Sequence, residues 1–163
     1  MRRALLLVAV GATVLALGVV AALAIQPSGD TATPVTATPL TRATLGEFGA
    51  KNGGIQVKSL QQSADMAIVK VVIEPGGSTG WHHHPGVVLV SVGSGTVTEY
   101  DPECHKTVIQ ASKGFVESNG EVHIVHNEGN ADAVFYVTFV IPTTTPSDGL
   151  TIADPKPKDC NVK

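Results

Sequence analysis

The sequence has few aromatic residues, few charges and only two cysteines. Aromatic residues make up 4% and charged residues 15% of the 163 positions, and the formal net charge is −3. No cluster of lysine or arginine is present, which argues against nucleic-acid binding. From residue 45 onward no pattern predicts a helix of more than a turn or two, except at residues 45–50. These absences point away from helical folds and from nucleic-acid partners.

Residues 1–25 form a targeting segment, for which two interpretations remain open. Arg2 and Arg3 precede a charge-free run at residues 4–25 that is rich in leucine, valine and alanine. Residues 22–24, Ala-Leu-Ala, fit the cleavage site of a signal peptide. The run is also long enough to span a bilayer as an uncleaved membrane anchor, which we favour. Arginines before the run place the remaining chain outside the cytoplasm in both cases. The run has no cysteine at its end, so a lipoprotein is disfavoured.

The rest of the chain divides into a linker, one domain and a tail. Residues 26–44 are rich in threonine and proline, which predicts an extended linker that holds the domain away from a membrane. Residues 45–142 contain short apolar runs separated by Gly, Pro and Asn, and residues 143–163 form a C-terminal tail. Such runs predict an all-β sandwich or barrel. The predicted strands are residues 55–60, 66–73, 87–92, 96–100, 106–109, 123–125 and 133–141.

The stretch Gly-Trp-His-His-His-Pro-Gly at residues 80–86 contains the strongest functional signal. Side chains on a strand alternate between faces, so His82 and His84 point to one face and His83 to the other. Two histidines whose Cα atoms lie about 7 Å apart and whose imidazoles point the same way can bind a single metal ion. His123 is the leading candidate for a third ligand.

Two spaced motifs resemble the signatures of the cupin superfamily. Residues 76–95 match the first signature, G-x5-H-x-H-x3-E-x6-G, except that Val88 stands where the family has Glu. Residues 120–127 match the end of the second signature, G-x2-H-x3-N, although Ser118 replaces the proline before it. The resemblance covers residues 55–141, which is most of the predicted domain.

The resemblance implies a double-stranded β-helix, or jelly-roll barrel, that holds one divalent transition metal in its mouth. His82, His84 and His123 correspond to family ligands, while Val88 faces the cavity without an oxygen to coordinate. Trp81 is expected to line the cavity rim. Iron, zinc, nickel and copper all accept imidazole ligands. The alternative is a barrel that has lost its metal and keeps hydrogen-bonded histidines, and a homodimer is also plausible for the family.

The other polar candidates are expected to have structural or surface roles. His83 and His126 are out of phase with the ligands, and His105 lies in a predicted turn. Glu117 could supply a replacement carboxylate, but the pattern favours a solvated position at the end of a strand. Asn127 is expected to fix a turn.

Cys104 and Cys160 are expected to pair, because two cysteines in a small domain outside the cytoplasm usually form a disulfide. The bond would strap the C-terminal tail across the barrel. A thiolate metal ligand is disfavoured, since neither cysteine has the phase of the histidines.

Two functions remain open at this level. The first is a metal-dependent, dioxygenase-like enzyme that acts on a small organic substrate. The second is a non-enzymatic module that binds a small molecule or a metal outside the cell. No acid or base is in register with the predicted ligands, which argues against the enzyme.

Overall fold

The computed structural model describes residues 34–117 and 120–162, and all regular structure within these ranges is β-strand. The predicted targeting segment and the first part of the predicted linker fall in residues 1–33, outside the described residues. Within the part of the chain that is described, no helix is long and apolar enough to cross a membrane.

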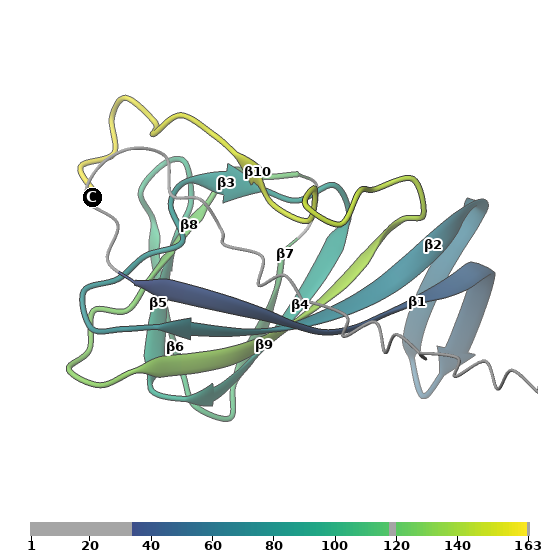
Figure 1. Ribbon diagram of the computed structural model, residues 1–163, viewed down its shortest axis with the longest axis horizontal. Helices are drawn as coiled ribbons and strands as arrows, with labels where there is room; N and C mark the ends of the chain where they lie inside the picture. Colours follow the sequence, from purple (N-terminus) through teal and green to yellow (C-terminus); the bar gives the residue numbers. More distant parts are fainter. Residues whose placement is uncertain (1–33, 118–119, 163) are drawn as a thin grey trace, which may run out of the picture.

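A large antiparallel sheet forms one layer of the domain and curls along its length (Figure 1). Its inner face provides the floor beneath the candidate site. In spatial order its strands are β1 (Val35–Asn52), β2 (Ile55–Ile73), β9 (Ala133–Pro142), β4 (Val87–Ser94) and β7 (Gly114–Glu117).

The second layer consists of two smaller sheets joined by a β-bridge between His82 and His123. Together with the large sheet they form the cupin-like double-stranded β-helix that the sequence motifs predicted. One small sheet has the order β6 (Lys106–Gln110), β5 (Thr96–Tyr100) and β8 (Ile124–His126), and the other pairs β10 (Ile152–Ala153) with β3 (His82–His83).

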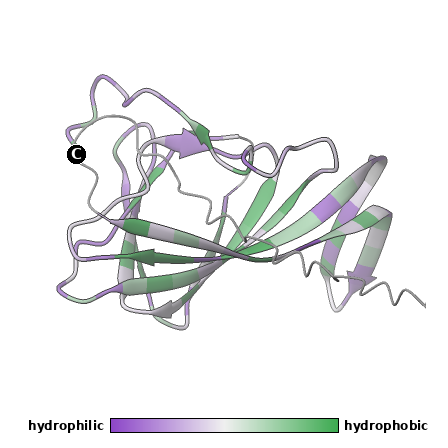
Figure 2. Cartoon of the chain, viewed as in Figure 1, coloured by the Kyte–Doolittle hydropathy of each residue, from purple (hydrophilic) through white to green (hydrophobic). Residues whose placement is uncertain are grey.

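Buried and more exposed residues alternate strictly along β9, and the buried ones form part of the core. Phe135, Val137, Phe139 and Ile141 point inward and are buried, while residues between them are more exposed. Figure 2 shows apolar residues concentrated on the strands of the large sheet. Replacing a buried phenylalanine such as Phe139 with alanine typically costs about 3–5 kcal/mol of stability.

The structure corrects the predicted boundary between linker and domain. Strand β1 begins at Val35, so residues 35–44 belong to the sheet, and residues 45–50 are strand rather than a helical turn. Threonine is β-branched and favours strands, and Ala37 is buried in the core. Pro39 is tolerated because β1 is an edge strand and because the pairing shifts register directly after it.

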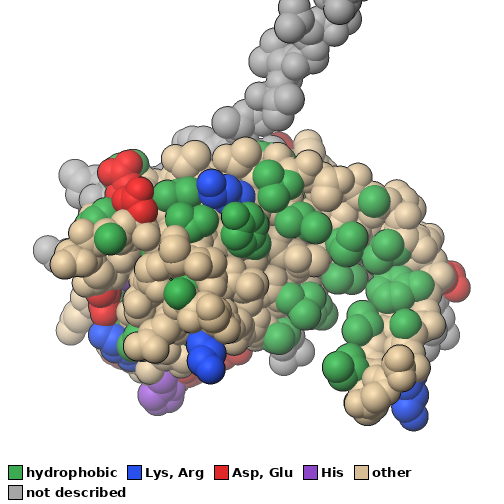
Figure 3. Space-filling model, turned by 90° about the horizontal axis from the view of Figure 1, so that it is seen from below, with side chains coloured by type: hydrophobic (Ala, Val, Ile, Leu, Met, Phe, Trp, Pro, Cys, Tyr) green, Lys and Arg blue, Asp and Glu red, His purple; other side chains and the backbone are tan. Residues whose placement is uncertain are grey.

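The distal halves of β1 and β2 form a two-stranded ribbon that projects from the body (Figure 1). Strand β2 pairs with β9 only from Ala64 onward, so residues 55–59 pair with β1 alone. Arg42 Nε lies 2.7 Å from Asp65 Oδ2 at the base of this ribbon. Apolar side chains remain on its surface (Figure 3). Ile55, for example, is 72% exposed.

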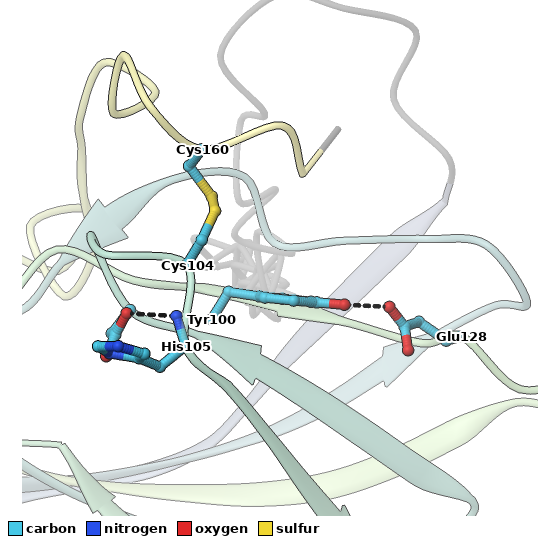
Figure 4. The surroundings of a disulfide bond; sticks show 6 residues. Tyr100, Cys104, His105, Glu128 and Cys160 are labelled. Carbon is cyan, nitrogen blue, oxygen red and sulfur yellow. Dashed lines mark hydrogen bonds and ion pairs between the residues drawn. A yellow bond between two sulfur atoms is a disulfide. The ribbon is translucent and has the colours of Figure 1, made fainter.

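The C-terminal segment is fastened to the barrel rather than loose. Strand β10 pairs with β3 over the open side of the large sheet (Figure 1). Cys160 forms the predicted disulfide with Cys104, with their Cα atoms 5.4 Å apart (Figure 4). Cys160 is buried in a small cluster with Trp81 and Ile124, so residues 148–160 form a strap across the barrel.

Candidate metal centre

Backbone pairing brings the three predicted histidine ligands together. His82 and His123 exchange both of their backbone N–H···O hydrogen bonds, each at 2.9 Å. Residues paired in this way carry their side chains on the same face, and the two rings lie 4.4 Å apart. The His84 ring lies 4.7 Å from the ring of His82. All three side chains are buried, and one ligand atom from each lies within 4.8 Å of the others.

The orientation of each imidazole is fixed by a backbone carbonyl. In all three rings Nδ1 lies within hydrogen-bond distance of a carbonyl oxygen, which can only accept. Each Nδ1 therefore carries a proton, so in the neutral form of each ring the free lone pair is on Nε2. This is the arrangement that orients histidine as a metal ligand. The carbonyl partners of His82, His84 and His123 are, in order, those of Gly80 at 2.8 Å, Leu150 at 2.7 Å and Glu121 at 2.9 Å.

Glu117 joins this cluster, so the expectation that it lies solvated at the end of a strand is wrong. Its side chain is only 9% exposed, and its carboxylate oxygens lie 3.1 Å from His84 Nε2 and 3.3 Å from His123 Nε2. The reason is the pairing of β7 with β4, which places Glu117 directly opposite Val88. Directly paired residues share a face and have Cβ atoms about 5 Å apart. The carboxylate therefore occupies the position beside the one where the family motif has Glu.

The titratable groups in the cluster shift one another's pKa values. Burial alone would raise the pKa of Glu117, but its contacts with His123 and His84 outweigh this effect and lower the pKa to about 2. Burial, reinforced by the neighbouring His123 and His84, lowers the pKa of His82 to about 3. Burial would lower the pKa of His123, but the adjacent Glu117 carboxylate raises it. Glu117 is thus an anion, and His82 is a neutral imidazole.

Unsatisfied polar atoms within the cluster fit a metal ion. Glu117 Oε2 and His123 Nε2 are buried and have no hydrogen-bond partner among the described residues. Buried polar atoms are rarely left in this state. Three imidazole nitrogens and one carboxylate oxygen are a donor set that zinc, iron, nickel and copper accept.

A cavity of about 410 Å³ adjoins the cluster. His82, His84 and Glu117 form its polar end, and Trp81 lines its wall as expected. Val88 points inward and is fully buried, but it is not part of the cavity wall.

The remaining polar candidates lie away from this cluster. His83 is half-buried, with Nδ1 2.5 Å from Asp154 Oδ2, and the half-buried His126 packs edge-on against a tyrosine. His105 is exposed and contacts the carboxylate of a nearby aspartate. Asn127 is buried and fixes a turn through three hydrogen bonds to the backbone.

No protein-family model matches the sequence, and no curated protein matches it. Solved structures do show similarity, and those below 25% identity show the fold alone. An uncharacterized conserved protein with a double-stranded β-helix domain from Klebsiella pneumoniae is 15% identical, with 80% of this chain and 87% of that chain covered, at a TM-score of 0.53. A cupin domain from Bordetella pertussis is 23% identical, with 46% and 80% covered, at a TM-score of 0.42. A cupin superfamily protein from Desulfitobacterium hafniense is 10% identical, with 70% and 84% covered, at a TM-score of 0.47.

Proposed function

We propose that this cupin-like domain works outside the cytoplasm, binds one divalent transition metal and acts as a metal-dependent, dioxygenase-like enzyme on a small organic substrate. His82, His84, His123 and Glu117 would hold the metal. One observation carries the proposal: three buried imidazoles, each fixed through Nδ1, bring ligand atoms within 4.8 Å of one another, and two of them, His84 and His123, direct Nε2 toward the buried Glu117 carboxylate.

The residues around the site have distinct roles in this proposal. A bound metal would polarise a substrate oxygen or activate dioxygen. Glu117 offsets part of the metal charge, and the carbonyls behind the histidines hold the rings in place. Phe139 packs edge-on against His84, with ring centroids 5.3 Å apart, and shields that side of the site from water.

A non-enzymatic binding module is the second candidate, and the cavity lining favours it. Among the described residues that line the cavity, the titratable groups are His82, His84, Glu117 and Asp148. The first three are proposed metal ligands and Asp148 is exposed. The cavity therefore offers no buried acid or base besides the ligands themselves.

The location outside the cytoplasm rests on two supports. Residues 1–25 have the composition of an export signal or anchor. The Cys104–Cys160 disulfide suits an oxidising compartment.

Metal analysis of the purified protein tests the proposed centre. After loading with zinc, iron, copper and nickel in turn, the parent should hold one ion per chain. His82→Ala, His123→Ala and Glu117→Gln should lose stoichiometric metal, while His83→Ala, whose side chain faces away, should retain it. Equal loss in all four variants, or no metal in the parent, would overturn the proposal. Screening small organic substrates with the loaded protein, with and without oxygen, then separates an enzyme from a binding module.

A further inference from the structure

The cavity beside the candidate metal centre is apolar over most of its length. Its floor comes from the inner face of the large sheet, and the residues that form it are buried. They include Val69, Val71, Val90, Phe135, Val137 and Phe139.

Strand register shows how this floor extends away from the centre. Glu117 lies in a row across the sheet with Val88 and Phe139. The next inward-facing row contains Val90, Val137 and Val69, and the one after it pairs Phe135 with Val71. Two residues along a strand span about 7 Å, so these apolar rows lie about 7 and 14 Å from the carboxylate row.

The charges that face the cavity allow little negative charge on a ligand. No lysine or arginine is among the described residues that line it. Glu117 contributes one negative charge at the inner end, and Asp148 contributes another at an exposed position. A divalent ion bound by three neutral imidazoles and Glu117 carries a net charge of +1, which balances a single negative charge. A second charge placed over the valine rows would be buried without a partner, which is costly.

We propose, on the basis of the proposed metal centre, that the cavity binds an elongated, largely apolar molecule with one polar end and at most one negative charge. The polar end, a hydroxyl or a single carboxylate, contacts the metal beside Glu117. The apolar body lies along the rows of Val69, Val90 and Phe135. The cavity volume of about 410 Å³ falls in the usual range for sites that bind small organic molecules. Small dicarboxylates are excluded.

A series of linear carboxylates tests this specificity on the zinc-loaded full-length protein. Affinity measured by calorimetry should rise about fourfold for each added methylene, from acetate up to the chain length that fills the third row. The dicarboxylate of each length should bind no better than acetate. Dicarboxylates that bind as tightly as monocarboxylates of equal length, or an affinity independent of chain length, would overturn the inference.

Cavity-filling variants locate the apolar body. Val69→Phe fills the middle row and should weaken octanoate binding at least tenfold while leaving acetate binding within about threefold. Leu89→Phe places the same side chain on the exposed outer face and serves as the matched control. If Val69→Phe does not fold, Val71→Phe makes the same test one row further away. Equal octanoate affinity in the parent and in the folded cavity variant would refute this placement.

Failure of this inference can be told apart from failure of the metal proposal. If the parent binds no metal but octanoate still binds better than acetate, the apolar cavity is retained and the metal centre is wrong. If the parent holds one metal ion but shows no preference for chain length or for a single charge, the metal centre stands and the specificity is wrong.

Discussion

Removal of the Cys104–Cys160 disulfide should weaken both the stability of the domain and its metal site. The bond anchors the end of the strap, and the strap contributes the Leu150 carbonyl that accepts from His84 Nδ1 at 2.7 Å. It also contributes β10, which pairs with β3 beside His82. Loss of the crosslink therefore loosens an element that orients two of the four proposed ligands.

The size of each effect follows from the structure. The cysteines are 56 residues apart, and closing a loop of this length stabilises the folded state by about 4 kcal/mol in the chain-entropy model. For a domain of this size, that corresponds to a fall in melting temperature of about 15 °C. A histidine ligand that loses its outer hydrogen-bond partner typically costs 10- to 100-fold in metal affinity, so zinc binding should weaken by about that factor.

The assay compares the parent with Cys104→Ser/Cys160→Ser and Cys104→Ala/Cys160→Ala. The alanine pair controls for the hydroxyl that serine would bury next to Trp81. Melting temperature and zinc affinity, the latter from competition with a chelator, are measured with and without reductant. The parent should respond to reductant and both variants should not. A double variant that keeps the parent melting temperature and binds zinc within threefold of the oxidised parent would refute the argument.

Three further predictions concern the turn, the carboxylate and the location of the protein. Asn127→Ala removes two N–H···O bonds and one acceptor at a buried turn, so unfolding in urea should show a loss of about 2–3 kcal/mol, and an unchanged midpoint would contradict this. Glu117→Val should lose zinc, and adding Val88→Glu should restore it, because the two positions are directly paired. No recovery in a folded double variant would mean that the carboxylate cannot act from β4. A reporter active only outside the cytoplasm, fused after Ile141, should give signal, and signal from a cytoplasmic reporter alone would refute export.

The strands in which apolar and polar residues alternate regularly could be predicted from the sequence. Residues 96–100 and 133–141 coincide closely with β5 and β9, because period-two patterns on half-buried strands are strong signals. Residues 35–44 could not be assigned, since their threonines and prolines suit both a linker and an edge strand. Only the packing of Ala37 into the core distinguishes the two.

The strap gave no sequence signal beyond its cysteine. Its contribution to the site is the backbone carbonyl of Leu150, and any residue type can supply a carbonyl. Its regular structure is the two-residue strand β10, which is too short for a periodic pattern. Composition correctly identified a crosslinked tail, but contacts that depend on backbone position required the structure.

At the candidate centre, the sequence motif lacks the family Glu, whereas the structure places another carboxylate beside the histidines. The motif fixes positions along the sequence, and at one of them, on β4, Val88 replaces the family Glu. A metal ion responds to positions in space, and Glu117 is the residue paired with Val88 on the neighbouring strand β7. Neighbouring strands lie about 4.8 Å apart, so in the proposed centre the carboxylate lies one strand spacing from the motif position and supplies the same charge. Pairing of β7 with β4 is a long-range contact that periodicity within either strand does not reveal. The absence of the motif Glu is therefore compatible with the proposed set of four donors.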